Sequence, residues 1–97
     1  MFQQGRHNGG RLVAVRSAPN EVGITRLAYS VSRRVGKAVI RNKVRRRLRE
    51  IARALPLTEG FDIVVTARPA AAAADFWTLK AEVELLLTRA RVLENQV

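Results

Sequence analysis

The sequence has no cysteine and a single histidine, His7. The absence of cysteine excludes disulfides, thiolate zinc sites and a cysteine nucleophile, and it suits a reducing cytosol. One histidine leaves little material for metal binding or acid–base catalysis. No apolar run approaches the ~18 residues that span a bilayer, and the polar residues 1–10 do not resemble a signal peptide. We therefore expect a cytoplasmic protein without a membrane segment.

Acidic residues are also scarce. Eight Asp and Glu stand against 18 Lys and Arg, which gives a net charge of +10 at pH 7, and fifteen of the cations are arginine. The planar guanidinium group matches phosphate bidentately and stacks on bases. A chain of 97 residues supports one modest core, so we expect a single domain over residues 1–97. Its partner is expected to be a polyanion: nucleic acid first, an anionic membrane surface second.

The charge is concentrated in residues 33–53, which hold ten cations and only Glu50 as an anion. Residues 37–55 have the periodicity of a helix that Pro56 ends. Its apolar stripe, which must face a core, consists of Ile40, Val44, Leu48, Ile51 and Leu55. The opposite side carries basic and amide side chains along ~18 Å of helix axis: Arg41, Asn42, Arg45, Arg46, Arg49 and Arg53.

This grouping of charge favours a binding surface over a solvated helix face. Solvated faces usually intersperse acids for i,i+4 pairs, and like charges at this spacing repel unless a polyanion relieves them. A helix-turn-helix protein would place a second helix before the basic one, whereas a strand is expected there. A membrane-surface helix would carry bulky aromatics on its apolar face, and this stripe has none. The pattern therefore favours an RNA-binding α+β domain.

Three strands are expected, at Arg11–Arg16, Arg26–Ser32 and Phe61–Arg68. The turn residues Pro19 and Gly23 lie between the first two and predict an antiparallel hairpin. In the second strand, Tyr29 alternates with apolar neighbours and is a candidate core residue.

A second helix is expected from Asp75, as N-cap, to Leu93, and the alanines 70–74 before it form a linker or an extra helical turn. Its apolar positions are Phe76, Leu79, Val83, Leu86, Ala90 and Leu93. Its charged positions are interpreted as a solvated face: Lys80, Glu82, Glu84, Arg89 and Arg91.

Catalysis by this chain alone is not expected. The acids are scattered, and Asp62 is the only one within an expected strand, where an arginine could pair with it. His7 lies among glycines in an expected loop, and Gly9-Gly10 does not continue into a phosphate-binding motif. We expect no catalytic residue and no metal ligand in the chain.

The stretch KAVIRNKVRRRLRE, residues 37–50, resembles the RNR motif of the protein subunit of bacterial ribonuclease P. The flanking segments TRLAYSVSRRVG and GFDIVVTARP resemble the strands on either side of that motif. Residues that fall on the motif in register are Lys37, Ala38, Val39, Arg41, Asn42, Arg45, Arg46, Arg49 and Glu50.

The resemblance implies a small α+β domain in which helices pack on a mixed four-stranded sheet. The element order is α-β-β-β-α-β-α, with a left-handed β-α-β crossover and an N-terminal helix that is short or absent here. It also implies that an RNA subunit with bound Mg²⁺ removes the 5′ leader of precursor tRNA, while the protein binds that RNA and the leader. RNA-binding residues are then expected at Arg33, Arg34, Lys37, Arg41, Asn42, Lys43, Arg45, Arg46, Arg49 and Arg53.

Leader-binding residues carried over in the same way are Phe2, Arg11, Arg26, Tyr29 and Arg68. Family members usually have an N-terminal helix that walls the leader cleft, and FQQG resembles the end of that helix. Two other hypotheses stay open: a structural RNA-binding protein of the ribosomal type, and a nuclease that acts alone. The partners expected are the catalytic RNA and precursor tRNA, with neither DNA nor membrane.

Overall fold

Four strands and two α-helices make up the part of the chain that the computed structural model describes, residues 5–93. In chain order the elements are β1 (Arg6–Gly9), β2 (Val13–Pro19), β3 (Arg26–Val31), the 3-10 helix η1 (Arg33–Val35), α1 (Ala38–Arg53), β4 (Phe61–Ala67), the 3-10 helix η2 (Pro69–Ala73) and α2 (Phe76–Arg89). The mixed four-stranded sheet and the α+β class are as expected.

The strand order is β1-β2-β4-β3. Strand β2 is antiparallel to β1 and β4, whereas β3 is parallel to β4. The predicted hairpin between residues 11–16 and 26–32 is therefore wrong, although the direction of the chain does reverse between them. Strand β4 lies between β2 and β3 and pairs with both. Strand β3, α1 and β4 form a β-α-β unit, and this unit places β4 next to β2.

Strand β1 corrects another prediction, because His7 lies within it and not in a loop. Its residues pair with β2, so that His7 stands opposite Arg16. The segment RHNG lacks the alternation of apolar and polar residues that predicts a strand. Strand β2 begins at Val13, two residues later than expected, and continues to Pro19.

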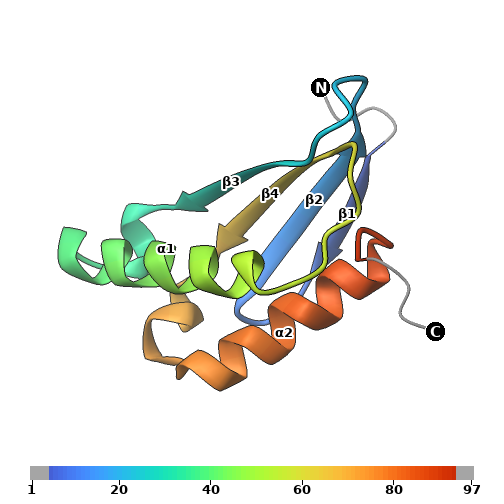
Figure 1. Cartoon of the computed structure of the whole chain (residues 1–97). Coiled ribbons are helices and arrows are strands. Elements are labelled where there is room, and N and C mark those ends of the chain that lie inside the picture. The colour runs from blue at the N-terminus through green and yellow to red at the C-terminus, as the bar shows by residue number, and fades with distance from the viewer. Residues whose placement is uncertain (1–4, 94–97) are drawn as a thin grey trace.

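Both helices cover the same face of the sheet (Figure 1). Alternate strand residues such as Val15 and Val65 point into this core and are almost fully buried. The other face carries exposed residues on three strands, including Arg16, Ala28 and Thr66. We call this uncovered side of β1–β4 the open face.

Helix α1 meets the core through the centre of its predicted stripe. Val44, Leu48 and Ile51 are buried, whereas Ile40 is 38% exposed, and Leu55 lies beyond the helix end at Arg53. Gly36, with φ 151°, connects η1 to α1. A Cβ there would lie 3.1 Å from three atoms of Ile40, so the turn favours glycine.

Helix α2 begins as expected, because Asp75 is its N-cap and accepts a hydrogen bond from the Thr78 N–H at 2.8 Å. It ends at Arg89, earlier than expected, and Leu93 instead forms a β-bridge with Leu57. Of the preceding alanines, 70–73 belong to η2 and Ala74 is its C-cap, so the helical turn is the one of the two expected alternatives that forms.

Glu82 does not belong to a solvated face, and that interpretation was wrong. Its carboxylate accepts three backbone hydrogen bonds from the turn between β1 and β2: from Arg11 at 3.2 Å, Leu12 at 2.6 Å and Val13 at 2.7 Å. Helical periodicity cannot reveal this role, because the donors lie about seventy positions earlier in the chain. One carboxylate therefore fastens α2 to the β1–β2 turn.

Candidate nucleic-acid interface

All ten residues predicted to bind RNA lie on η1, on α1 or in the short connection between them. We call this set the α1 surface. Eight of its members are exposed, whereas Arg41 and Arg45 are partly buried. Within residues 5–93 the ion pairs are Arg26–Asp62 and Lys80–Glu84, so no carboxylate of that range forms an ion pair with the α1 surface.

The direction of α1 adds to this unpaired positive charge. Its first turn contains no acid, and the N-cap Lys37 makes no side-chain capping hydrogen bond. The positive end of the helix dipole therefore lies among cations, an arrangement that costs stability and that a bound anion relieves. Arg41 leaves its buried Nε without a partner among the described residues.

Two arginines of α1 have internal contacts. Arg45 donates from Nη1 to Oδ1 of Asn42 at 3.0 Å, which positions both side chains on the exposed face. Arg47 donates from Nη1 to the carbonyl oxygen of Ala74 at 2.9 Å and so ties α1 to the segment before α2. Arg47 therefore has a structural contact, and Arg45 remains part of the α1 surface.

Tyr29 and Arg26, both predicted to contact the leader, lie on opposite faces of the sheet. Tyr29 packs against the core on the helix-covered face. Burial raises the pKa of the Tyr29 hydroxyl, and the nearby charges of Arg49 and Arg53 oppose that rise. Tyr29 thus neighbours the α1 surface. The other predicted residues are dispersed: Arg11 lies exposed in the β1–β2 turn, and Phe2 falls outside the described residues.

Basic residues also gather on the open face. Arg16 stands beside Val64 of β4, and Val64 beside Ala28 of β3. Neighbouring atoms of β3 and β4 line a shallow hollow of about 240 Å³ there. By alternation along β4, Arg68 continues this face, and its Nη2 lies close enough to Gly9 to obstruct a Cβ at that position. The alternation of β2, with Val13 and Val15 inside, could have assigned Arg16 to this face.

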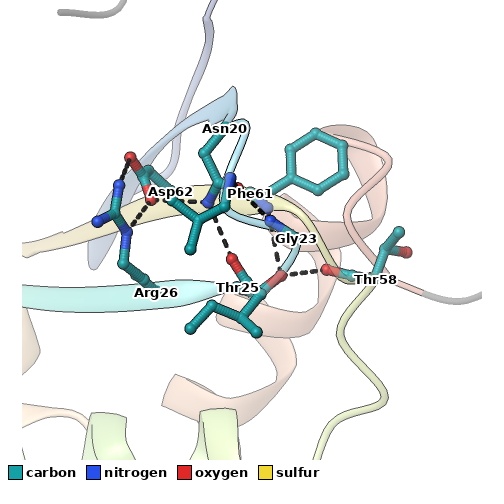
Figure 2. A network of polar contacts seen from close by, with 9 residues as sticks. Asn20, Gly23, Thr25, Arg26, Thr58, Phe61 and Asp62 are labelled. Carbon is teal, nitrogen blue, oxygen red and sulfur yellow. Dashed lines mark hydrogen bonds and ion pairs between the residues drawn. The ribbon is translucent and has the colours of Figure 1, made fainter.

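A polar network closes one end of the open face (Figure 2). Asn20 donates to Oδ1 of Asp62 and to the carbonyl oxygen of Ile24, both at 2.9 Å. Arg26 holds the same carboxylate with two hydrogen bonds of 2.8 Å, from Nε and Nη2. The hydroxyl of Thr25 donates to the Thr58 carbonyl oxygen. This network fixes the loop after β2 against the first residues of β4.

The network predicts an effect of pH on stability. The hydrogen bonds from Arg26 and then from Asn20 lower the pKa of Asp62 below its usual value near 4. Because the folded-state pKa is depressed, the stabilisation is present above about pH 4 and is lost as the pH falls through the folded pKa. The gap in free energy of unfolding between wild type and Asp62→Asn should therefore shrink toward zero on acidification. Urea unfolding of both proteins from pH 7 to pH 3 measures it, and a gap that stays constant would contradict the prediction.

Other features of residues 5–93 concern metals and membranes. No group of three His, Cys, Asp or Glu side chains in this range is placed to hold a metal ion. None of the helices described is both long and apolar enough to cross a bilayer.

Comparison with known proteins places this geometry in a family. The family model described as Ribonuclease P matches residues 1–91. The ribonuclease P protein component of Caldanaerobacter subterraneus subsp. tengcongensis is 38% identical over 98 residues, covering 99% of this chain and 84% of that protein. That of Symbiobacterium thermophilum is 38% identical over 99 residues, covering 99% and 86%.

Comparison with solved structures identifies the same family. The ribonuclease P protein of Staphylococcus aureus superposes with a TM-score of 0.84 at 30% identity, covering 96% of this chain and 87% of that one. That of Thermotoga maritima gives 0.81 at 34% identity, covering 97% and 88%. The chain therefore belongs to the ribonuclease P protein family, the protein components of a tRNA-processing ribonuclease.

Proposed function

We propose that the α1 surface binds the catalytic RNA subunit of ribonuclease P. The observation that carries this proposal is the row of exposed cations on α1 and η1 with which no carboxylate of residues 5–93 forms an ion pair. Arginine forks spaced along one helix face suit the phosphates of a folded RNA. Tyr29, beside Arg49 and Arg53, would extend the same surface onto β3.

The open face is the surface that we assign to the 5′ leader of precursor tRNA. Arg16 and Arg68 supply charge for its phosphates, and the small side chains of Ala28 and Val64 leave a floor on which a base can lie. Single-stranded RNA is held by this combination of charge and flat apolar contact. Arg26 forms an ion pair with Asp62. We therefore assign it a structural role at the edge of the hollow and not the neutralisation of a phosphate.

The chemistry is assigned to the RNA subunit. We assign the Mg²⁺ of the holoenzyme mainly to the RNA subunit, and no group of three His, Cys, Asp or Glu side chains in residues 5–93 is placed to hold a metal ion. The protein's part is binding and orientation: it would screen phosphate repulsion between two RNA molecules and hold the leader in a fixed position. We place this activity in the cytoplasm.

Reconstitution tests the proposal. Purified protein, a bacterial ribonuclease P RNA and end-labelled precursor tRNA are mixed at low Mg²⁺, and release of the 5′ leader is followed. Cleavage at the mature 5′ end should require both protein and RNA, and protein alone should release nothing. The proposal would be overturned if the protein did not stimulate cleavage by the RNA, or if the protein alone cleaved precursor tRNA.

Variants separate the two surfaces. Arg16→Gln with Arg68→Gln should weaken holoenzyme binding of precursor tRNA several-fold and leave binding of mature tRNA, which has no leader, unchanged. Equal losses for both substrates would contradict the assignment of the open face. Arg46→Gln with Arg49→Gln should instead weaken assembly with the RNA subunit.

A further inference from the structure

A second basic pocket lies on the helix-covered face, where β1 begins, β2 ends, β4 begins and α2 ends. Its volume is about 250 Å³, and its lining residues are Arg6, Ser17, Pro19, Phe61, Ala90 and Arg91. No residue of η1 or α1 takes part, so the pocket is separate from the α1 surface. It is also separate from the open face, because Ser17 belongs to the alternate residues of β2 that point to the helices.

The polar lining of the pocket is cationic. Arg6 pairs with Ser17 across β1 and β2, and Arg91 approaches from the end of α2. No carboxylate of residues 5–93 lines the pocket, and within that range neither arginine belongs to an ion pair. Ser17 is the one buried polar residue of that range, at 2% exposure. Two guanidinium groups and a hydroxyl are donors suited to a phosphate group.

The backbone of Arg91 is a second, independent sign of function. The end of α2 forms a Schellman motif: Arg91 N–H donates to the Thr88 carbonyl at 3.0 Å and Val92 N–H to the Leu87 carbonyl at 3.2 Å. Arg91 occupies its left-handed position with φ 60°, the only residue other than glycine in residues 5–93 with a positive φ. Glycine is preferred there because a Cβ is strained. Arg91 therefore lines the pocket from a backbone position that suits glycine better, which points to a role for its side chain.

The Schellman hydrogen bonds also reduce the electrostatic objection to an anion at this place. The carboxyl end of a helix repels negative charge through its unpaired carbonyl groups. Here the carbonyls of Leu86, Leu87 and Thr88 all accept hydrogen bonds from the residues that follow. The end of α2 therefore leaves these three carbonyl groups paired beside the two arginines of the pocket.

From the pocket we infer a binding site for one single-stranded nucleotide, with its phosphate between Arg6 and Arg91 and its ring against Phe61. The volume lies just below the ~300 Å³ at which small-molecule pockets begin, so it holds a phosphate and a ring but not a dinucleotide. The side chains of Pro19 and Phe61 supply the apolar wall. The inference rests on the proposed function only for the source of the nucleotide, a stretch of RNA that continues past the α1 surface.

Adenosine 5′-monophosphate is the probe, and adenosine is the matched control without phosphate. In ¹H–¹⁵N spectra of the full chain, the backbone amides of Arg6, Ser17 and Arg91 and the arginine Nε–H signals should shift saturably with the nucleotide. Adenosine should leave them in place. Nucleotide-induced shifts confined to η1 and α1 would overturn the inference.

The variant Arg91→Gly separates binding from folding. Glycine is favoured at the left-handed position, so the melting temperature should not fall, whereas affinity for the nucleotide should drop at least tenfold. Arg6→Gln should cause a similar loss. Unchanged affinity in Arg91→Gly would refute the site. Because these titrations contain no RNA subunit, their result is independent of the reconstitution that tests the proposed function.

Discussion

Replacing Glu82 by alanine should lower the free energy of unfolding by about 3 kcal/mol. The substitution leaves the N–H groups of Leu12 and Val13 without their acceptor in a partly buried turn, and each such loss costs about 1–3 kcal/mol. The third donor, on Arg11, is exposed and can bond to water. In a domain of this size the melting temperature should fall by roughly 15 °C, at 4–8 °C per kcal/mol. Thermal and urea unfolding followed by circular dichroism measure both quantities.

Glu84 on the same helix provides the matched control. It is exposed and meets Lys80 at 3.5 Å, so Glu84→Gln should change stability by less than about 0.5 kcal/mol. Gly10→Ala should approach the effect of Glu82→Ala, because a Cβ there would lie 2.6 Å from the Glu82 carboxyl group and displace it. If Glu82→Ala were as stable as Glu84→Gln, the three hydrogen bonds would not hold the turn.

Replacing Arg46 and Arg49 together by glutamine should weaken binding to ribonuclease P RNA by about 30-fold. Both side chains are exposed on α1, and about 1 kcal/mol for each lost phosphate contact gives about 2 kcal/mol in total. The logarithm of affinity should also depend less on the logarithm of salt concentration, with a slope smaller by between one and two units. Filter binding across a series of KCl concentrations measures both effects.

A charge-matched variant excludes a general effect of net charge. Lys80→Gln with Arg89→Gln also removes two cations, but from α2, away from the α1 surface. It should leave affinity within about threefold of wild type and change the salt slope little. If both double variants lost the same affinity for the RNA, binding would depend only on the net charge of the protein and not on the α1 surface.

The α1 surface could be predicted from sequence because both of its determinants are local. A period of 3.6 residues places Val44, Leu48 and Ile51 on one side and the arginines on the other, whatever the rest of the chain does. The ends of the apolar stripe do not follow from spacing alone. Ile40 belongs to the stripe by spacing, yet it is 38% exposed. The first turn of α1 extends past the edge of the core, which the helix first meets at Val44.

Pairings between distant segments could not be predicted in the same way. The turn residues after β2 signal a reversal of the chain, but they do not say which strand becomes the neighbour. That choice depends on α1, which returns the chain so that β4 enters between β2 and β3. Tyr29 and Arg26 are three positions apart on one strand, and strand alternation puts them on opposite faces.

The sequence by itself determined the basic character of the protein, the arginine face of α1 and the motif by which the family is recognised. These properties follow from composition and from spacing within one helix. The tertiary structure alone decided the strand order, the role of Glu82, the open face and the pocket between Arg6 and Arg91. Each of these joins groups that are distant in the chain, and long-range contacts depend on how whole elements pack and bury surface.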